Sequence, residues 1–476
     1  FKLPNFFRHM FAEGAFNAAF VPLFAGRLAE DGKRGALEFA AEAASVLTTM
    51  LLAFTLAALL TMPWLMYVIA PGFVDQPDKF TLTIELTQIT FPYLLFMALI
   101  ALMGGMLNSL HRFAAAAAAP IVLNIVLIGT LLGARHGVFP ESLIPSSAHA
   151  LAWGVFVAGV GQFFWIAYAC HKADILFYMP RPRLTLGVRR LIVLMVPGII
   201  GAGVVQINLV IDVVLASTLT EGSVSYLYYA DRVNQLPLGV VGVAIGIALL
   251  PLLTRQLRNG EADAARDSQN RAIEFALMLS APATAALIIA AEPIVTVLFQ
   301  RGEFDVVATT ATAAALRAFA IGLPAYVLIK SLTPGYFARQ DTKTPVQIAI
   351  AAVVLNILLA LVLMQFLAHA GIALATAIAA WLNAIALGVV LVRRGHLSFD
   401  DRLRRRTPRI IAAAALMGAV VYMGAKELAG PLAGTEAARI PALVALVVAG
   451  LGAFVTFARL LGAFRFNDIK AAFSKN

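Results

Sequence analysis

Residues 46–70 read VLTTMLLAFTLAALLTMPWLMYVIA, a stretch without a single charged side chain. A helix needs about 20 apolar residues to cross a hydrocarbon core of ~30 Å, so this stretch predicts a membrane-spanning helix. Similar apolar blocks recur along the chain, separated by charged residues, glycine and proline. Of the 476 residues, 61% are apolar and 13% are charged. This composition excludes a soluble enzyme and favours one multi-span membrane domain.

The sequence therefore predicts an all-α polytopic membrane protein. Thirteen helices are expected, near residues 1–26, 40–70, 82–110, 114–134, 147–170, 188–218, 223–254, 271–300, 307–336, 344–367, 371–393, 408–428 and 438–461. The chain opens at Phe1 inside an apolar stretch, so a further first helix is expected to precede it. Cys170 is the single cysteine, and no His or Cys pairs have metal-ligand spacing. We therefore expect no disulfide, no metal site and no cofactor.

Lysine and arginine residues sort to alternate connections between the predicted helices. One set of connections and the C-terminal tail together hold 26 of the 36 cations, whereas the opposite set holds five. The positive-inside rule assigns the richer set, and with it the C-terminus, to the cytoplasm. The net charge of +10 is then mostly a topology signal, and no nucleic-acid partner is expected. The remaining five cations are assigned to helix interiors and not to connections; a charge there is costly and marks a functional candidate: Lys2, Arg8, Arg232, Arg317 and Lys330.

Two parts of the chain share a layout at a nearly constant offset. Pro92 precedes Asn124 by 32 residues, as Pro324 precedes Asn356, and three further matches have offsets of 229 to 236 residues. Six predicted spans separate equivalent positions, so the two copies run in the same direction through the membrane, as parallel repeats do. The predicted domains are an N-terminal lobe lacking its first helix (1–170), a cytoplasmic basic linker (171–190), a C-terminal lobe (191–394), a second basic linker (395–408), two extra helices (409–462) and a cytoplasmic tail (463–476). A site between two such lobes is the usual setting for alternating access.

The first candidate site is one side of the first helix. Lys2, Asn5, Arg8, His9 and Glu13 fall within an arc of about 140° on a helix that is otherwise apolar. This pattern indicates the cationic wall of a polar cavity. The alternative is a helix end whose long side chains extend to the membrane surface.

The second candidate site lies on the helix predicted from residue 223. It carries Tyr228, Asp231, Arg232 and Gln235 on one side. The alternative is a self-satisfied Asp231–Arg232 pair on a helix whose glycines serve close packing. The repeat places Lys2 level with Asp231 and Arg232, so both lobes present cations at matching depth. Facing cations repel unless an anion lies between them, which predicts a cargo with concentrated negative charge, such as a diphosphate.

Several charged residues are weaker candidates. Asp212 is expected either to bind a coupling cation or to form a salt bridge within its lobe. Lys330 and Arg317 are explained equally well by function and by extension to the membrane surface. Glu85 has no assigned role.

The stretch FKLPNFFRHMFAEGAFNAAFVPLF at residues 1–24 closely resembles the MurJ (MviN) family of lipid II flippases, in the multidrug/oligosaccharidyl-lipid/polysaccharide exporter superfamily. Further matches are APGF from Ala70, TFPYLLF from Thr90, GSVSYLYYADRVNQLPLGVVGVAIG from Gly222 and PGYFARQDTKTPV from Pro334. The resemblance implies fourteen helices, a central cationic cavity, and a groove formed with the last two helices for a polyprenyl tail.

The same resemblance implies roles for individual residues. The family's cavity arginines match Arg8 and Arg232, and its acidic partners match Glu13 and Asp231. Two positions depart from the pattern: His9 stands where arginine is frequent, and Gln235 where some members carry an acid.

The expected function is transport of lipid II, the lipid-linked peptidoglycan precursor, from the inner to the outer leaflet of the bacterial inner membrane. Its expected partners are this lipid, membrane lipids and other cell wall synthesis proteins. One alternative is a cation-coupled drug exporter of the same superfamily or an exporter of another polyprenyl-linked oligosaccharide. Another is a membrane enzyme acting on polyprenyl phosphates, which would normally need clustered acids for magnesium. The adjacent acidic pairs Glu30-Asp31 and Asp400-Asp401 lie instead in basic loops.

Overall fold

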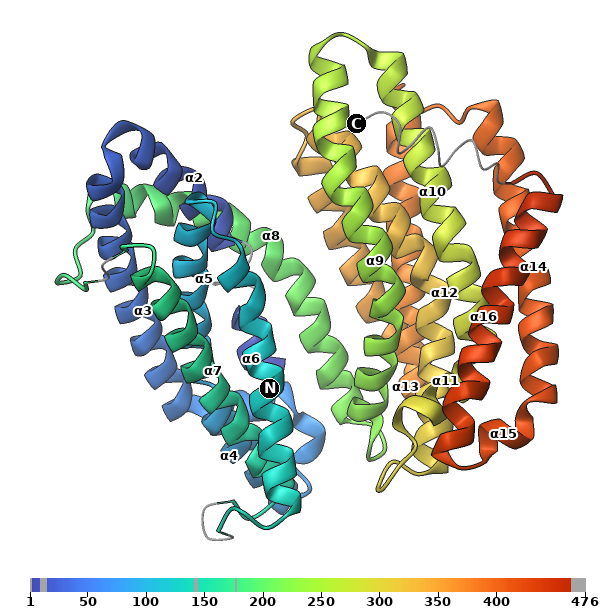
Figure 1. Cartoon of the computed structure of the whole chain (residues 1–476), viewed down its shortest axis with the longest axis horizontal. Helices are drawn as coiled ribbons and strands as arrows, with labels where there is room; N and C mark the ends of the chain where they lie inside the picture. The colour runs from blue at the N-terminus through green and yellow to red at the C-terminus, as the bar shows by residue number, and fades with distance from the viewer. Residues whose placement is uncertain (1, 9–14, 141–143, 176–177, 464–476) are drawn as a thin grey trace. The chain divides into compact units, whose positions relative to one another are not determined.

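The computed structural model describes residues 2–8, 15–140, 144–175 and 178–463. These residues are almost entirely helical, as Figure 1 shows. Among them, nine helices are long and apolar enough to cross a bilayer. That number counts α4 and α5 as one span and α13 as one span, although α13 contains two antiparallel arms. The prediction of an all-α membrane protein is confirmed.

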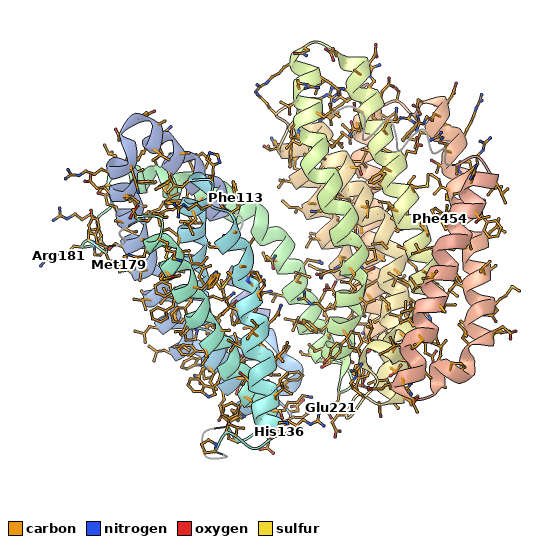
Figure 2. All side chains as sticks on the ribbon, in the orientation of Figure 1. Phe113, His136, Met179, Arg181, Glu221 and Phe454 are labelled. Atoms are coloured by element: carbon orange, nitrogen blue, oxygen red, sulfur yellow. The ribbon has the colours of Figure 1, made fainter. Side chains whose placement is uncertain are left out.

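By contacts between residues, the chain divides into two compact units, Phe1–Val214 and Leu215–Asn476. The helices of unit 1 are, in chain order, α1 (Lys2–Arg8), α2 (Ala15–Glu30), α3 (Gly32–Ile69), α4 (Pro77–Thr90), α5 (Tyr93–Ser109), α6 (Ala114–Arg135), α7 (Ser147–His171) and α8 (Leu186–Ser217). The last residues of α8 belong to unit 2. A short 3₁₀ turn, η2 (Pro71–Phe73), follows α3. Figure 2 shows Phe113 and His136 at the two ends of α6.

Unit 2 continues with α9 (Ser223–Arg258), α10 (Ala262–Ile289), α11 (Ala291–Phe299), α12 (Val306–Phe337), α13 (Lys343–Arg393), α14 (Asp401–Glu427), α15 (Ala429–Ala433) and α16 (Glu436–Leu460). α12 lies at its centre and packs against α9, α10, α11 and α13. Small residues on α12 let its neighbours approach closely, and Leu316 and Leu323 fill the core between them. The last helices, α14 and α16, pack along each other and are joined through α15 (Figure 1).

The core of unit 1 depends on aromatic residues at helical spacing. Phe16, Phe20 and Phe24 lie along one side of α2, and the ring of Phe20 stacks on Phe39 of α3 at 5.8 Å between centroids. All four rings are buried. This stack fixes α2 against α3.

Five predicted helices differ clearly from the observed ones, and two of them, expected at 40–70 and 408–428, begin earlier, at Gly32 and Asp401. The expected helix 82–110 is two helices, α4 and α5, that meet at Phe91-Pro92, because proline lacks the N–H that would continue the ladder. The expected helix 271–300 begins earlier, at Ala262, and divides at Ala290 into α10 and α11. The expected helix 1–26 is represented by α1 and α2, and residues 9–14 lie outside the described residues.

The two arms of α13 match the separately predicted helices 344–367 and 371–393. Ala368 has φ 47° and ψ −132°, which reverses the chain direction between the arms. A Cβ atom on Gly371 would lie 2.3 Å from the carbonyl oxygen of Leu363, so this close crossing requires glycine. α13 is therefore a helical hairpin.

Candidate functional site

The polar face of α1 is held in place by the apolar face opposite it. Leu3 and Phe7 contact the cluster beside α3 and α5, and the ring of Phe7 lies 4.8 Å from that of Phe54. Anchoring this face turns Asn5 and Arg8 to the other side of the helix. There, Nε of Arg8 donates a hydrogen bond to Oδ1 of Asn5 at 2.7 Å. Asn5 and Arg8, two of the candidate site residues identified from the sequence, are therefore in contact in the structure.

The other members of the first candidate site are only partly described. Lys2 begins α1, but its side chain lies outside the described residues, as do His9 and Glu13 entirely. Their membership of the site stays a prediction.

The second candidate site occupies the exposed side of α9. Leu227, Ala230 and Val233 are buried in the core of unit 2, which directs the opposite side of the helix outward. On this outward side, Nε2 of Gln235 donates a hydrogen bond to Oδ2 of Asp231 at 2.6 Å. The structure also brings these two selected residues together.

Arg232 lies beside this pair on α9. Its guanidinium carbon is 5.0 Å from the centre of the Tyr228 ring, a cation–π arrangement. The ring steadies an exposed guanidinium whose planar fork suits two phosphate oxygens. The local arrangement is that of an anion-binding group beside a carboxylate–amide pair.

The weaker candidates have different surroundings. Nη2 of Arg317 lies 3.5 Å from Oε2 of Glu292, and its Nε donates to the carbonyl of Ile288 at 3.4 Å. Arg317 therefore has a partner in its own unit, which supports a structural role. Asp212 is half-buried on α8, and Lys330 is exposed on α12. Among the described residues, no group of three or more His, Cys, Asp or Glu side chains could hold a metal ion.

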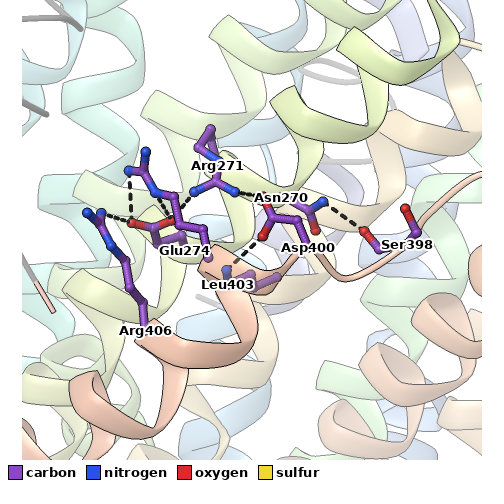
Figure 3. A network of polar contacts seen from close by, with 8 residues as sticks. Asn270, Arg271, Glu274, Ser398, Asp400, Leu403 and Arg406 are labelled. Carbon is purple, nitrogen blue, oxygen red and sulfur yellow. Dashed lines mark hydrogen bonds and ion pairs between the residues drawn. The ribbon is translucent and has the colours of Figure 1, made fainter.

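Sequence reasoning missed a buried polar network, which we call the Glu274 cluster. The Glu274 side chain on α10 is 7% exposed and forms ion pairs with three arginines (Figure 3), namely Arg271, Arg402 and Arg406. Arg271 also pairs with Asp400, and Asn270 donates to the carbonyl of Ser398 at 2.8 Å. The cluster therefore fixes the second basic linker and the start of α14 to α10. The sequence EFA occurs at Glu38 and again at Glu274, one of the matches between the two repeats, but nothing in it indicates the partners of Glu274.

The first basic linker has a comparable attachment in unit 1. Oγ1 of Thr185 donates to Oε2 of Glu42 at 2.8 Å, and Nζ of Lys33 donates to the carbonyl of Ala173 at 3.2 Å. Ser45 donates to the carbonyl of Pro180. All three of these partners belong to α3, while Met179 and Arg181 of the linker point outward (Figure 2).

The small residues of α14 and α16 pack inside the bundle rather than forming a concave surface. A Cβ on Gly450 would lie 3.0 Å from Val421, one on Gly424 2.9 Å from Leu446, and one on Gly418 2.7 Å from Ile289. These three glycines therefore allow close packing with neighbouring side chains and do not shape a groove. Gly452 differs, because a Cβ there would meet no atom within 4 Å.

Comparison with known proteins gives one consistent family. The sequence profile described as "Lipid II flippase MurJ" matches residues 1–435. A Rhizobium meliloti (strain 1021) protein named "Probable lipid II flippase MurJ" is 46% identical over 465 residues, covering 97% of this chain and 86% of the relative. A Rhizobium tropici protein of the same name is 49% identical over 423 residues, covering 88% and 78%.

Solved structures agree on the fold. A structure titled "Lipid II flippase MurJ, inward closed conformation" matches with a TM-score of 0.77 and 24% identity, covering 96% of this chain and 91% of that one. An inward-facing multidrug resistance MATE family transporter of the MOP superfamily matches with a TM-score of 0.66 and 16% identity, covering 83% and 88%. At these identities the likeness shows a shared fold.

Proposed function

Since this chain belongs to the MurJ family of lipid II flippases, we propose that it moves lipid II from the inner to the outer leaflet of the bacterial cytoplasmic membrane by alternating access. The observation that carries this function is the identity of 46% over 97% of the chain with a relative of that name. The likeness to multidrug transporters extends to the fold alone and does not favour drug export. The protein is a transporter in this proposal, so its cargo leaves with its covalent structure unchanged.

We propose that Arg8 and Arg232 bind the diphosphate of the cargo. Support comes from their positions on the outward sides of α1 and α9, opposite side chains that are packed in the cores. Asn5 orients Arg8 through the 2.7 Å hydrogen bond, and Tyr228 steadies Arg232. Each guanidinium offers two parallel N–H groups to phosphate oxygens, which a lysine ammonium does not.

Lys2, Glu13, Asp231 and Gln235 complete the proposed site around these arginines. The Gln235 amide keeps the Asp231 carboxylate hydrogen-bonded beside Arg232. A carboxylate that already accepts a hydrogen bond repels an incoming phosphate less. Its negative charge also limits the net positive charge of the site, so that the cargo can dissociate after transport. Asp212 and Lys330 are proposed to have structural or ion-coupling roles.

The proposed topology places the two basic linkers and the C-terminus in the cytoplasm. Both linkers are rich in arginine, so they are expected on the same side of the membrane, and each is attached to its own unit, at α3 and at α10. The positive-inside rule gives that side as the cytoplasm.

We propose that the prenyl tail of the cargo lies along the hairpin of α14 and α16. Exposed aliphatic side chains follow one side of α16 at helical spacing, at Ile440, Val444, Val448, Leu451 and Val455. Such a stripe suits a long hydrocarbon chain at membrane depth. Membrane lipids cover the remaining apolar surface, and enzymes that polymerise the exported precursor are the proposed protein partners, because they consume the product of transport.

The test is transport in vesicles that contain the purified chain and fluorescent lipid II. We expect the fraction accessible to a membrane-impermeant reagent to rise with the wild-type chain while mass spectrometry shows unchanged lipid II. The Arg8→Ala and Arg232→Ala variants should give the rate of empty vesicles. Arg34→Ala is the matched control, because Arg34 is 93% exposed and pairs with Glu38 on the next turn of its own helix. Cleavage of the cargo, or an unchanged leaflet distribution with the wild-type chain, would reject the proposal.

A further inference from the structure

An open pocket of about 620 Å³ lies on the surface of unit 1 among α3, α4 and α7. Its volume is in the range of sites for small organic molecules, ~300–1,000 Å³. Trp153 and Phe156 form aromatic walls, aliphatic and proline side chains supply further apolar surface, and Glu85, Gln88 and His149 are the polar lining. The proposed flippase function uses none of these residues.

Among the described residues of this lining, Glu85 carries the only carboxylate. Its Oε2 atom lies 3.5 Å from Nε2 of His149, which is beyond a normal hydrogen bond length, and the Glu85 side chain is 53% exposed. The other ring nitrogen of His149, Nδ1, lies 2.8 Å from Oγ of Ser146. The imidazole is thus held by a hydrogen bond at Nδ1 and lies within ion-pair distance of Glu85 at Nε2, while the carboxylate keeps surface available for a ligand.

Gln88 has a positioning role beside the carboxylate. Its Nε2 atom donates a hydrogen bond to the carbonyl of Leu59 at 3.2 Å, which ties α4 to α3 at the edge of the pocket. Glu85 and Gln88 are one turn apart on α4, so this tie also holds the backbone that carries Glu85. Placing a charged carboxylate within a membrane span costs free energy, so such a residue usually has a partner and is a candidate for a functional role.

The pocket is flanked by apolar surface on two helices. α3 exposes Leu56, Leu60 and Trp64, and α7 exposes Trp153 and Val157. In a membrane-spanning unit, exposed side chains of this kind face hydrocarbon. A ligand with an apolar body is therefore favoured over a wholly polar one.

We propose that this pocket binds an organic ammonium group attached to an apolar body. The ammonium pairs with Glu85 and lies against the aromatic wall of Trp153, where the ring quadrupole attracts a cation. The apolar body contacts Phe156 and the aliphatic lining. An anion is disfavoured by the carboxylate, and a bare calcium-like ion requires about six to eight oxygen ligands.

The test compares two probes of equal length with the purified full chain in dodecyl maltoside micelles. Hexylammonium carries the proposed charge, and 1-hexanol is its neutral counterpart; their dissociation constants are measured by saturation-transfer nuclear magnetic resonance. We expect the wild-type chain to prefer hexylammonium by tenfold or more. Glu85→Gln should abolish this preference, whereas Asp78→Asn, which removes an exposed acid from the same helix, should retain it.

A second variant keeps the test decisive if Glu85→Gln fails to fold, as judged by thermal unfolding. Trp153→Leu preserves the carboxylate and should weaken hexylammonium binding several-fold while changing hexanol binding less. Equal affinity of the wild-type chain for the two probes, or equal losses in Glu85→Gln and Asp78→Asn, would overturn the proposal. Because the readout is binding, it is independent of lipid II transport.

The ammonium group has two possible sources, and native mass spectrometry separates them. Phosphatidylethanolamine that remains bound to the wild-type chain but not to Glu85→Gln identifies an amine-bearing membrane lipid. Selective hexylammonium binding with no retained lipid identifies a diffusible amine. Both results support the ammonium site.

Discussion

Arg394 donates a hydrogen bond from Nη1 to Oδ2 of Asp341 at 2.6 Å, across 53 positions in the chain. Asp341 precedes α13 and Arg394 follows it, so the pair joins the two ends of that helical hairpin. Nη2 of Arg394 also donates to Oγ1 of Thr344 at 3.2 Å, and Oδ1 of Asp341 accepts from the N–H of Thr344 at 3.0 Å. The turn at Ala368 closes one end of the hairpin, and this polar group closes the other.

Asp341 should therefore stabilise the hairpin in a pH-dependent way. Hydrogen bonds from Thr344 and then the charge and hydrogen bond of Arg394 lower the pKa of Asp341 to about 2. An Asp in an unfolded chain has a pKa of about 3.9. Because the folded-state pKa is the lower one, the stabilisation is fully present above pH ~4 and is lost as the pH falls towards 2.

Asp341→Asn should accordingly lower the free energy of unfolding by about 1 kcal/mol at pH 7, in the range of a lost helix-capping interaction. Thermal unfolding from pH 8 to pH 2 checks this, with Asp75→Asn, an exposed loop acid, as the control. A difference between wild type and Asp341→Asn that persists at pH 2 would contradict the assignment.

The two proposed diphosphate ligands should depend on guanidinium geometry as well as charge. Arg8→Ala and Arg232→Ala are expected to abolish complementation of a strain that lacks its own flippase, with near-normal amounts of protein in the membrane. Arg8→Lys and Arg232→Lys should restore growth only partly, since lysine loses the bidentate fork. Full complementation by both alanine variants would remove these residues from the site.

The Glu274 cluster should be sensitive to loss of its single central acid. Glu274→Gln leaves three arginines around a neutral amide in a largely buried position, and removing one partner of a buried ion pair costs about 3–5 kcal/mol. Glu38, the matching residue of the repeated EFA motif, is 54% exposed, so Glu38→Gln should cost less than about 1 kcal/mol. Thermal unfolding of the two variants in detergent compares them directly, and equal losses would show that the cluster adds no stability of its own.

The hairpin of α14 and α16 offers a pair of glycines that separates packing from cargo contact. Gly450→Leu should lower the unfolding temperature, because its Cβ would lie only 3.0 Å from Val421. Gly452→Leu should leave the unfolding temperature unchanged, because the position is open. If the prenyl tail lies along this surface, Gly452→Leu should slow transport of lipid II while binding of a soluble diphosphate head group is retained. Unchanged transport would place the tail elsewhere.

Local patterns in the sequence were sufficient to predict the position of many of the helices. Uninterrupted apolar runs predicted α6 and α7 to within a few residues, and the short polar break near Ala368 separated the two arms of α13. The pairs Asn5–Arg8 and Asp231–Gln235 were predicted as shared faces because they are three and four residues apart. Residues three or four positions apart lie on the same face of any α-helix.

Interactions between distant residues could not be predicted in the same way. Glu292 lies 25 residues before Arg317, and nothing in either local pattern indicates that they pair. The sequence does not distinguish an arginine of residues 402–406 that binds Glu274 from one that faces water. Which of them binds depends on how α14 packs against α10. Similarly, the glycines of α14 and α16 look equivalent until their neighbours are known.

The Glu274 cluster also sets an order for the biogenesis of unit 2. Arg402 is made 128 residues after Glu274, an interval of roughly 6–26 s at typical translation rates of ~5–20 residues per second. During that interval α10 leaves the ribosome with a carboxylate whose only partner within the cluster is the neighbouring Arg271. The insertion machinery therefore handles α10 before its full set of counter-charges exists, and synthesis of Arg402 and Arg406 completes the cluster.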